Sequence, residues 1–232
     1  MSEEHDAFHE RGRRALLAHE EIWEVPPHPG SPRWGVSLVL RPDEDAAACL
    51  ASITSQVSHV AGERHWPTGR LGSAHLTVRV LEPYRDPVPL DDPLVVGYAE
   101  AARRIGEQSQ SPRFAMTGLL VALGGVLVAA EPSNEPAAEL RALVAAELGE
   151  NGHYEDDSYR GDVWWSTLLH FTEPLADGAA LVAWVDDRRA LDLGPFQAGS
   201  LDLVRYEYDG GVTAPVVLAS VPLSDQSVQP EV

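Results

Sequence analysis

The chain has 232 residues, of which 44% are hydrophobic, and this is enough for one sizeable core. Its formal net charge of −19 disfavours a long nucleic acid as a partner, because such partners are bound through clustered cations that release counterions. All 17 residues counted as Lys or Arg are arginine. The lack of lysine excludes both the phosphate-loop site of nucleoside triphosphatases and the adenylated lysine of a ligase.

The amino terminus and the apolar runs bear on the cellular compartment. The first residues are acidic and lack an apolar stretch, so we expect no secretory signal. The longest apolar run, 118–130, is interrupted by Gly124 and Gly125 and falls short of the roughly 20 residues that span a bilayer. The single cysteine, Cys49, excludes an internal disulfide. We therefore expect a cytoplasmic protein without a membrane partner.

Hydrophobic periodicity and turn residues predict an alternation of helices and strands. In chain order we expect a helix at 5–21, a strand at 34–40, a helix at 43–60, a strand at 73–81, a helix at 92–108, strands at 113–121 and 126–130, a helix at 135–148, a strand at 164–172, a helix at 176–189 and a closing hairpin at 199–208 and 214–221. A proline-rich connector follows the first helix, and an acidic loop lies at 150–161.

A strand–helix–strand–helix theme occurs about twice in this order. We therefore expect an α+β fold with two lobes, each an antiparallel-rich sheet with helices on its outer face, and a cleft between them. The domain would comprise residues 34–222, after a helical extension and linker at 1–33 and before a flexible tail at 223–232. His5 and His9 lie one turn apart in that extension, where we expect a solvated helix surface.

Two strands each carry a His-x-Thr triplet, at His75–Thr77 and at His170–Thr172. Side chains alternate across a strand, so residues two apart share a face. One face of the first strand would then bear Ser73, His75, Thr77 and Arg79. One face of the second would bear Trp164, Ser166, Leu168, His170 and Thr172. These faces are too polar for a dry core, which indicates that they line a cleft.

Histidine and threonine suit phosphodiester chemistry. Splitting the bond requires a base for the attacking oxygen and an acid for the departing one, and imidazole serves as either near neutral pH. The hydroxyls of Thr77 and Thr172 are placed to donate to the phosphoryl oxygens. We therefore take His75, Thr77, His170 and Thr172 as candidate catalytic residues. This chemistry requires no metal, so we expect no cofactor.

Three further residues are candidates for substrate binding. Arg79 shares the His75 face and would add a bidentate phosphate contact. Trp164 shares the His170 face and would stack on a base. Tyr206 lies on the closing hairpin and would also contact the ligand. For each residue the alternative is structural: a solvated strand position for Arg79, and core packing for Trp164 and Tyr206.

The pair His75-Leu-Thr-Val78 and His170-Phe-Thr-Glu173 resembles the two-histidine phosphoesterase superfamily, over about residues 34–222. That superfamily includes 2′-5′ RNA ligase-like proteins and cyclic nucleotide phosphodiesterases. The resemblance implies a bilobal fold, a metal-independent site between the lobes, and substrates such as 2′,3′-cyclic phosphates or 2′-5′ linkages. Glu173 departs from the family pattern, which usually has a hydrophobic residue fourth in each motif.

Three functions follow from this resemblance. The first is a phosphodiesterase that hydrolyses a small cyclic or 2′-5′-linked nucleotide, with one histidine as acid and the other as base. The second is 2′-5′ RNA ligation by the reverse step. The third, from a different class, is a catalytically silent nucleotide-binding or interaction module. We rank hydrolysis first because the acidic chain disfavours a large RNA, and we expect a monomer acting on a small nucleotide or short oligonucleotide.

Overall fold

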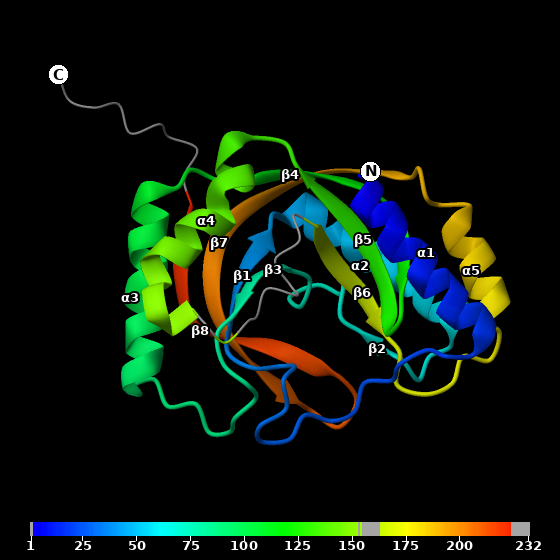
Figure 1. Ribbon diagram of the computed structural model, residues 1–232, viewed down its shortest axis with the longest axis horizontal. Coiled ribbons are helices and arrows are strands. Elements are labelled where there is room, and N and C mark those ends of the chain that lie inside the picture. Colours follow the sequence, from blue (N-terminus) through cyan, green and yellow to red (C-terminus); the bar gives the residue numbers. More distant parts are fainter. Residues whose placement is uncertain (1, 153, 155–162, 224–232) are drawn as a thin grey trace.

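The computed structural model describes residues 2–152, 154 and 163–223 (Figure 1). Within these residues the helices are α1 (Glu3–Ala18), α2 (Glu44–Ala61), α3 (Pro93–Gln108), α4 (Glu135–Leu148) and α5 (Gly178–Asp186), with a short 3-10 helix, η1, at Gly149–Gly152. The strands are β1 (Ser37–Pro42), β2 (Trp66–Pro67), β3 (Leu76–Val80), β4 (Arg113–Ala122), β5 (Gly125–Pro132), β6 (Trp164–His170), β7 (Asp192–Tyr208) and β8 (Thr213–Pro222). The predicted α+β class is confirmed.

Local signals in the sequence explain where α2 begins and which face it buries. The Asp43 side chain accepts a hydrogen bond from the Ala46 backbone at 2.8 Å and so satisfies an N–H group that the first turn leaves unpaired. Leu50, Ile53 and Val57 recur at the spacing of one helix face, and all three are buried. The predicted helix at 43–60 therefore formed nearly at its expected bounds.

One strand, β7, joins the two halves of the sheet. The strand order is β2-β6-β5-β4-β7-β1-β3, with β8 paired to β7. The first part of β7 pairs with β4, and its later part pairs with β1 and β8. The two expected sheets are thus two halves of one continuous sheet of eight strands.

The expected start of β7 was wrong, and the short strand β2 was not expected. The closing strand begins at Asp192 rather than at residue 199. Within the earlier part of the strand, Gly194 has a φ of 83° beside a register irregularity opposite β4, and glycine adopts this conformation without strain. No element was expected between the helix at 43–60 and the strand at 73–81, but Trp66–Pro67 pairs with the end of β6.

Helices cover the two halves of the sheet separately (Figure 1). In that view α3 and α4 lie together beside β8, whereas α1 and α5 lie on the opposite side beside β4. The helix α2 contacts β6 and β7. One core runs through both halves, since Leu40 and Leu76 from one half belong to the same buried cluster as Val128 and Leu169 from the other.

The amino-terminal helix is part of the packed structure. His5 and His9 were expected on a solvated helix surface, and this was wrong, since they are 2% and 6% exposed. The His9 ring lies 2.9 Å from Asp186 on α5 and accepts the Val121 backbone N–H of β4 at 3.2 Å. The α1 face therefore closes over the part of β4 that β7 does not pair.

Two sequence expectations concern segments at the limits of the described residues. Most of the acidic loop at 150–161 and nearly all of the expected tail at 223–232 lie outside them. Leu223 is described and buried, and its backbone N–H donates to Gly199 at 3.1 Å. Of the helices described, none combines the length and hydropathy that crossing a bilayer requires.

Candidate active site

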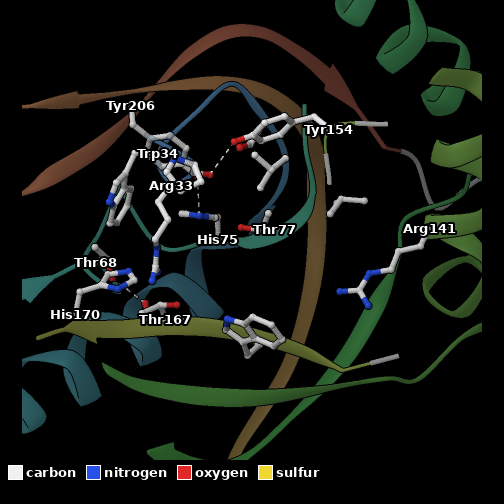
Figure 2. Close-up of a pocket in the computed structure, with 15 residues that line it drawn as sticks. Arg33, Trp34, Thr68, His75, Thr77, Arg141, Tyr154, Thr167, His170 and Tyr206 are labelled. Atoms are coloured by element: carbon white, nitrogen blue, oxygen red, sulfur yellow. Dashed lines mark hydrogen bonds between the residues drawn. The ribbon is translucent and has the colours of Figure 1, made fainter. Parts of the chain in front are cut away.

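A cavity of about 560 Å³ opens beside β3 and β6 (Figure 2). His75, Thr77, His170 and Tyr206, predicted from the sequence as site residues, all line it. Two arginines line it as well, and the described lining residues include no Asp or Glu. In a chain with 36 acidic residues and 17 arginines, this composition creates a local cationic pocket suited to an anion.

An irregularity in β3 moves Arg79 away from this lining. Leu38 of β1 pairs with Arg79, but the next residue, Val39, pairs with Thr77, so Val78 has no partner of its own. One extra residue in a strand reverses the faces of the residues beyond it. His75 and Thr77 therefore line the cavity together with Val80, whereas Arg79 does not. The predicted phosphate contact of Arg79 depended on unbroken alternation.

A similar irregularity in β6 reverses the faces on which Trp164 and Trp165 lie, compared with the prediction. Val126 of β5 pairs with Leu169 and Leu127 pairs with Thr167, which leaves Leu168 without a partner. As a result Trp165 and Thr167 line the cavity on the same side as His170. Trp164, predicted to stack on a base, is 3% exposed and packs against Phe114 in the main core, with ring centroids 5.0 Å apart. The predicted face was wrong for this part of the strand.

Thr172 lies beyond the end of β6 and outside the cavity lining. Its hydroxyl donates to the Arg64 carbonyl at 2.9 Å, and its backbone N–H donates to the His65 ring at 3.3 Å. On the His170 side of the cavity, the hydroxyl-bearing side chains are instead Thr68 and Thr167. The structure thus brings Thr77 of the first triplet to the cavity, but it does not bring Thr172 of the second.

Two hydrogen bonds orient the His75 ring. Nδ1 lies 2.7 Å from the Ser73 carbonyl, which can only accept, so Nδ1 carries the proton. Nε2 is then an acceptor, and it receives the Tyr206 hydroxyl at 3.1 Å. Burial is the main cause that lowers the pKa of His75 to about 4, with Arg41 adding to the shift and the Ser73 bond opposing it. The ring is therefore neutral at pH 7 with a basic nitrogen towards the cavity.

His170 has different surroundings. Its Nδ1 lies 3.8 Å from the Glu24 carboxylate, and its ring meets the Trp34 indole edge to face at 4.9 Å between centroids. Burial, together with the positive charge of Arg33 and the neighbouring His75, holds the pKa of His170 well below 6.5. A bound anion would oppose the effect of the Arg33 charge.

Sequence reasoning missed several lining residues. Arg33 and Trp34 come from the connector between α1 and β1. Arg33 was assigned to the linker at 1–33, and Trp34 was expected to begin the strand at 34–40. Arg141 comes from α4 and holds its guanidinium 3.8 Å from the Trp164 ring centroid. For Arg33 and Trp34, the signal in the sequence was the Arg-Trp-Gly triplet at the end of the connector. For Arg141 there was none, because a helix pattern does not show which arginine faces a distant strand.

The same residues bear on whether the site could hold a metal. In the part of the chain that the structure describes, no three His, Cys, Asp or Glu side chains gather in a way that would hold a metal ion. The polar side chains of the cavity lining are nitrogen and hydroxyl groups of His, Arg, Ser, Thr, Tyr and Trp, and Pro32, Val78 and Val80 are apolar. The arrangement can move protons between two imidazoles and hold an anion between cationic groups.

Comparison with known proteins gives a match at the level of structure. No protein-family model and no curated protein matches the chain. The protein TT0787 of Thermus thermophilus aligns with a TM-score of 0.60 and 17% identity, over 83% of this chain and 99% of that chain. A crystal structure described as a phosphoesterase gives 0.53 and 11%, over 82% and 98%. E. coli LigT in complex with 3′-AMP gives 0.53 and 12%, over 82% and 98%.

These identities are low, so the likeness bears on the fold alone. The resemblance that the two His-x-Thr strands carried is confirmed at that level. The chain has the α+β fold of TT0787, of the structure described as a phosphoesterase and of E. coli LigT, each of which aligns over nearly its whole length.

Proposed function

We propose that the chain is a phosphodiesterase that hydrolyses a small 2′,3′-cyclic or 2′-5′-linked nucleotide by paired-histidine acid–base catalysis. The observation that carries this proposal is the convergence of His75 and His170, from strands far apart in the sequence, on one cationic cavity. The resemblance of both strands to two-histidine phosphoesterases supports the same chemistry.

We assign the base to His75. Its Nδ1 proton is held by the Ser73 carbonyl, and its low pKa keeps Nε2 free to accept a proton. Nε2 takes a proton from water, whose oxygen attacks phosphorus. The Tyr206 hydroxyl, which bonds Nε2 in the absence of substrate, occupies the position from which that water would be activated.

We assign the acid to His170, which enters the reaction protonated. As the bond from phosphorus to the leaving oxygen breaks, His170 donates its proton to that oxygen. Burial lowers the pKa of His170 most, and the Arg33 charge lowers it further; the anionic substrate raises that pKa because it opposes the Arg33 charge. The Thr77 hydroxyl donates to a non-bridging oxygen, where negative charge increases in the transition state.

The size of the cavity favours a small ligand. A cavity of about 560 Å³ is within the range of small-molecule sites. E. coli LigT was solved with 3′-AMP, and we extend nucleotide binding to this chain as a proposal. We further propose that the reaction is metal-independent and that a monomer suffices, since one chain supplies every group named above. The cytoplasm remains our proposed location for the protein.

The test is turnover of 2′,3′-cyclic nucleotides and 2′-5′ dinucleotides by the wild type, His75→Ala and His170→Ala. Each substitution should lower kcat/KM by about 10²–10⁴-fold, the usual contribution of a general acid or base. His59→Ala, on an exposed position of α2, is the matched control and should leave turnover unchanged. Chelator should have no effect.

Other outcomes identify the alternatives. Activity in either histidine variant equal to that of the wild type would contradict the acid–base assignment. Nucleotide binding without turnover of any substrate would favour a silent binding module. Joining of a 2′,3′-cyclic phosphate end to a 5′-hydroxyl end, without hydrolysis, would favour ligation.

A further inference from the structure

The connector between α1 and β1 reaches the His170 end of the cavity. The Glu24 backbone N–H donates to the Phe171 carbonyl at 2.7 Å, directly after His170. Ile22 is similarly bonded to Leu123 at 2.8 Å. These bonds fix the connector along the ends of β4 and β6, and they place a carboxylate that is only 7% exposed next to the cavity.

The buried Glu24 carboxylate holds two neighbouring side chains. Oε1 lies 2.5 Å from the Arg33 guanidinium, and Oε2 accepts the Trp34 indole N–H at 3.1 Å. Oε1 is also 3.8 Å from His170. A buried carboxylate is costly unless it is paired and hydrogen-bonded, and here both conditions are met by residues that line the cavity.

The backbone at this point is held in a conformation that few residues adopt. Trp34 has a φ of 67°, in the left-handed region, which is unfavourable for a residue that carries a side chain. Its indole packs against the rings of Trp66, His170 and Tyr206. The next residue must be glycine, because a Cβ on Gly35 would lie 1.7 Å from the Glu82 carbonyl oxygen. The tertiary contacts thus fix the direction in which Arg33 leaves the chain.

Arg33 extends into the cavity from this fixed point. Figure 2 shows its side chain passing His75 towards Thr68 and His170. Its charge acts on His170, while its side chain stays 48% exposed. Arginine carries five N–H donors in a planar fork, and one of its terminal nitrogens faces Glu24. The donors that remain match the oxygens of a phosphoryl group.

We propose that Arg33, positioned by Glu24, is the residue that binds the phosphoryl anion between the two histidines. The connector is thereby a part of the active site, and it supplies the cation that Arg79 does not. That the anion is a substrate phosphodiester rests on the proposed function. Anion binding itself does not, and it can be measured without turnover.

The experiment is calorimetric titration of the full chain with adenosine 3′-monophosphate, and with adenosine as the neutral probe. Arg33→Met should raise the Kd for the nucleotide tenfold or more and leave the Kd for adenosine unchanged, because a charge-assisted hydrogen bond is lost. Arg33→Lys should restore part of the affinity. The matched control is Arg64→Met, which removes a more exposed arginine paired with Glu173 at 3.3 Å and should change neither Kd.

Glu24→Ala separates positioning from simple electrostatics. Removing a negative charge beside an anion site would tighten binding if charge alone mattered. If Glu24 positions Arg33, the variant binds the nucleotide several-fold more weakly, and the same substitution in an Arg33→Met background no longer weakens binding. Glu24→Gln, which keeps an acceptor for Trp34, should fall between the wild type and Glu24→Ala.

Two results would overturn the proposal. One is a Kd for Arg33→Met equal to that of Arg64→Met, which would place the anion elsewhere. The other is tighter nucleotide binding by Glu24→Ala while Arg33 is present. Nucleotide binding that depends on Arg33 in a protein that turns over no substrate would leave this inference intact and reject only the proposed function.

Discussion

The two histidine strands are alike in sequence and different in structure. In β3 the register irregularity follows the histidine, whereas in β6 it precedes the histidine. His75 is bonded on both ring nitrogens, to Ser73 and Tyr206, whereas His170 is surrounded by Glu24, Arg33 and Trp34 from the connector. A repeated motif therefore supplies two imidazoles with unequal environments, which is what separate acid and base roles require.

The strongest test of unequal roles for the two histidines is a substrate whose leaving group needs no proton. We compare a 2′,3′-cyclic nucleotide with a nucleoside p-nitrophenyl phosphate. His75→Ala should lower kcat/KM for both by about 10²–10⁴-fold, because both need a base. His170→Ala should show that loss only with the cyclic substrate. Equal losses of His170→Ala on both substrates would reject the division of roles, and the opposite pattern would exchange them.

The two threonines provide the next test. Thr77→Val should lower kcat by about 10²-fold, as for the loss of one donor to a developing oxyanion. Thr172→Val should change kcat by less than about twofold, because its hydroxyl bonds the Arg64 carbonyl outside the cavity. Thr172→Val is the matched control for Thr77→Val, since each substitution removes one hydroxyl. Equal losses of kcat in the two variants would show that Thr172 takes part in catalysis, as its motif predicted.

The pH dependence of kcat/KM sharpens the same comparison. The pKa of His75 is lowered to about 4 and that of His170 also lies below 6.5, so the form with neutral His75 and protonated His170 is most abundant on the acid side of pH 6.5. At pH values above 6.5 His170 has lost its proton, so kcat/KM should fall about tenfold for each further pH unit. A maximum above pH 7 would contradict the assignment. In His170→Ala, turnover of the p-nitrophenyl substrate should lack this falling limb.

The smallest expected effect concerns Tyr206, whose hydroxyl bonds only the neutral form of His75. Tyr206→Phe removes that bond, so the pKa of His75 should rise and the acid limb of the profile should move up by at most about one pH unit. Tyr208→Phe, on the same strand, removes a phenol that does not line the cavity and is the control. An acid limb in Tyr206→Phe that stays in place would show that the Tyr206 bond does not influence His75.

Local patterns brought most of the predicted residues to one cavity. The two histidines, Thr77 and Tyr206 line it, Thr172 does not, and the α+β class followed from the order of elements. Residues that depended on alternation across a whole strand do not line the cavity. Arg79 and Trp164 were assigned to the cavity face by counting two residues at a time, and one unpaired residue in each strand reversed that count.

The sequence by itself determined the helices with their caps, the buried strands and the two matched histidine triplets, because these arise from interactions between residues close along the chain. Only the tertiary structure decided which arginine serves the site. Arg33 and Glu24 are joined to His170 by contacts across more than a hundred residues of sequence, and no local periodicity encodes such contacts. The same long-range packing closed α1 over β4 and made the connector a wall of the cavity.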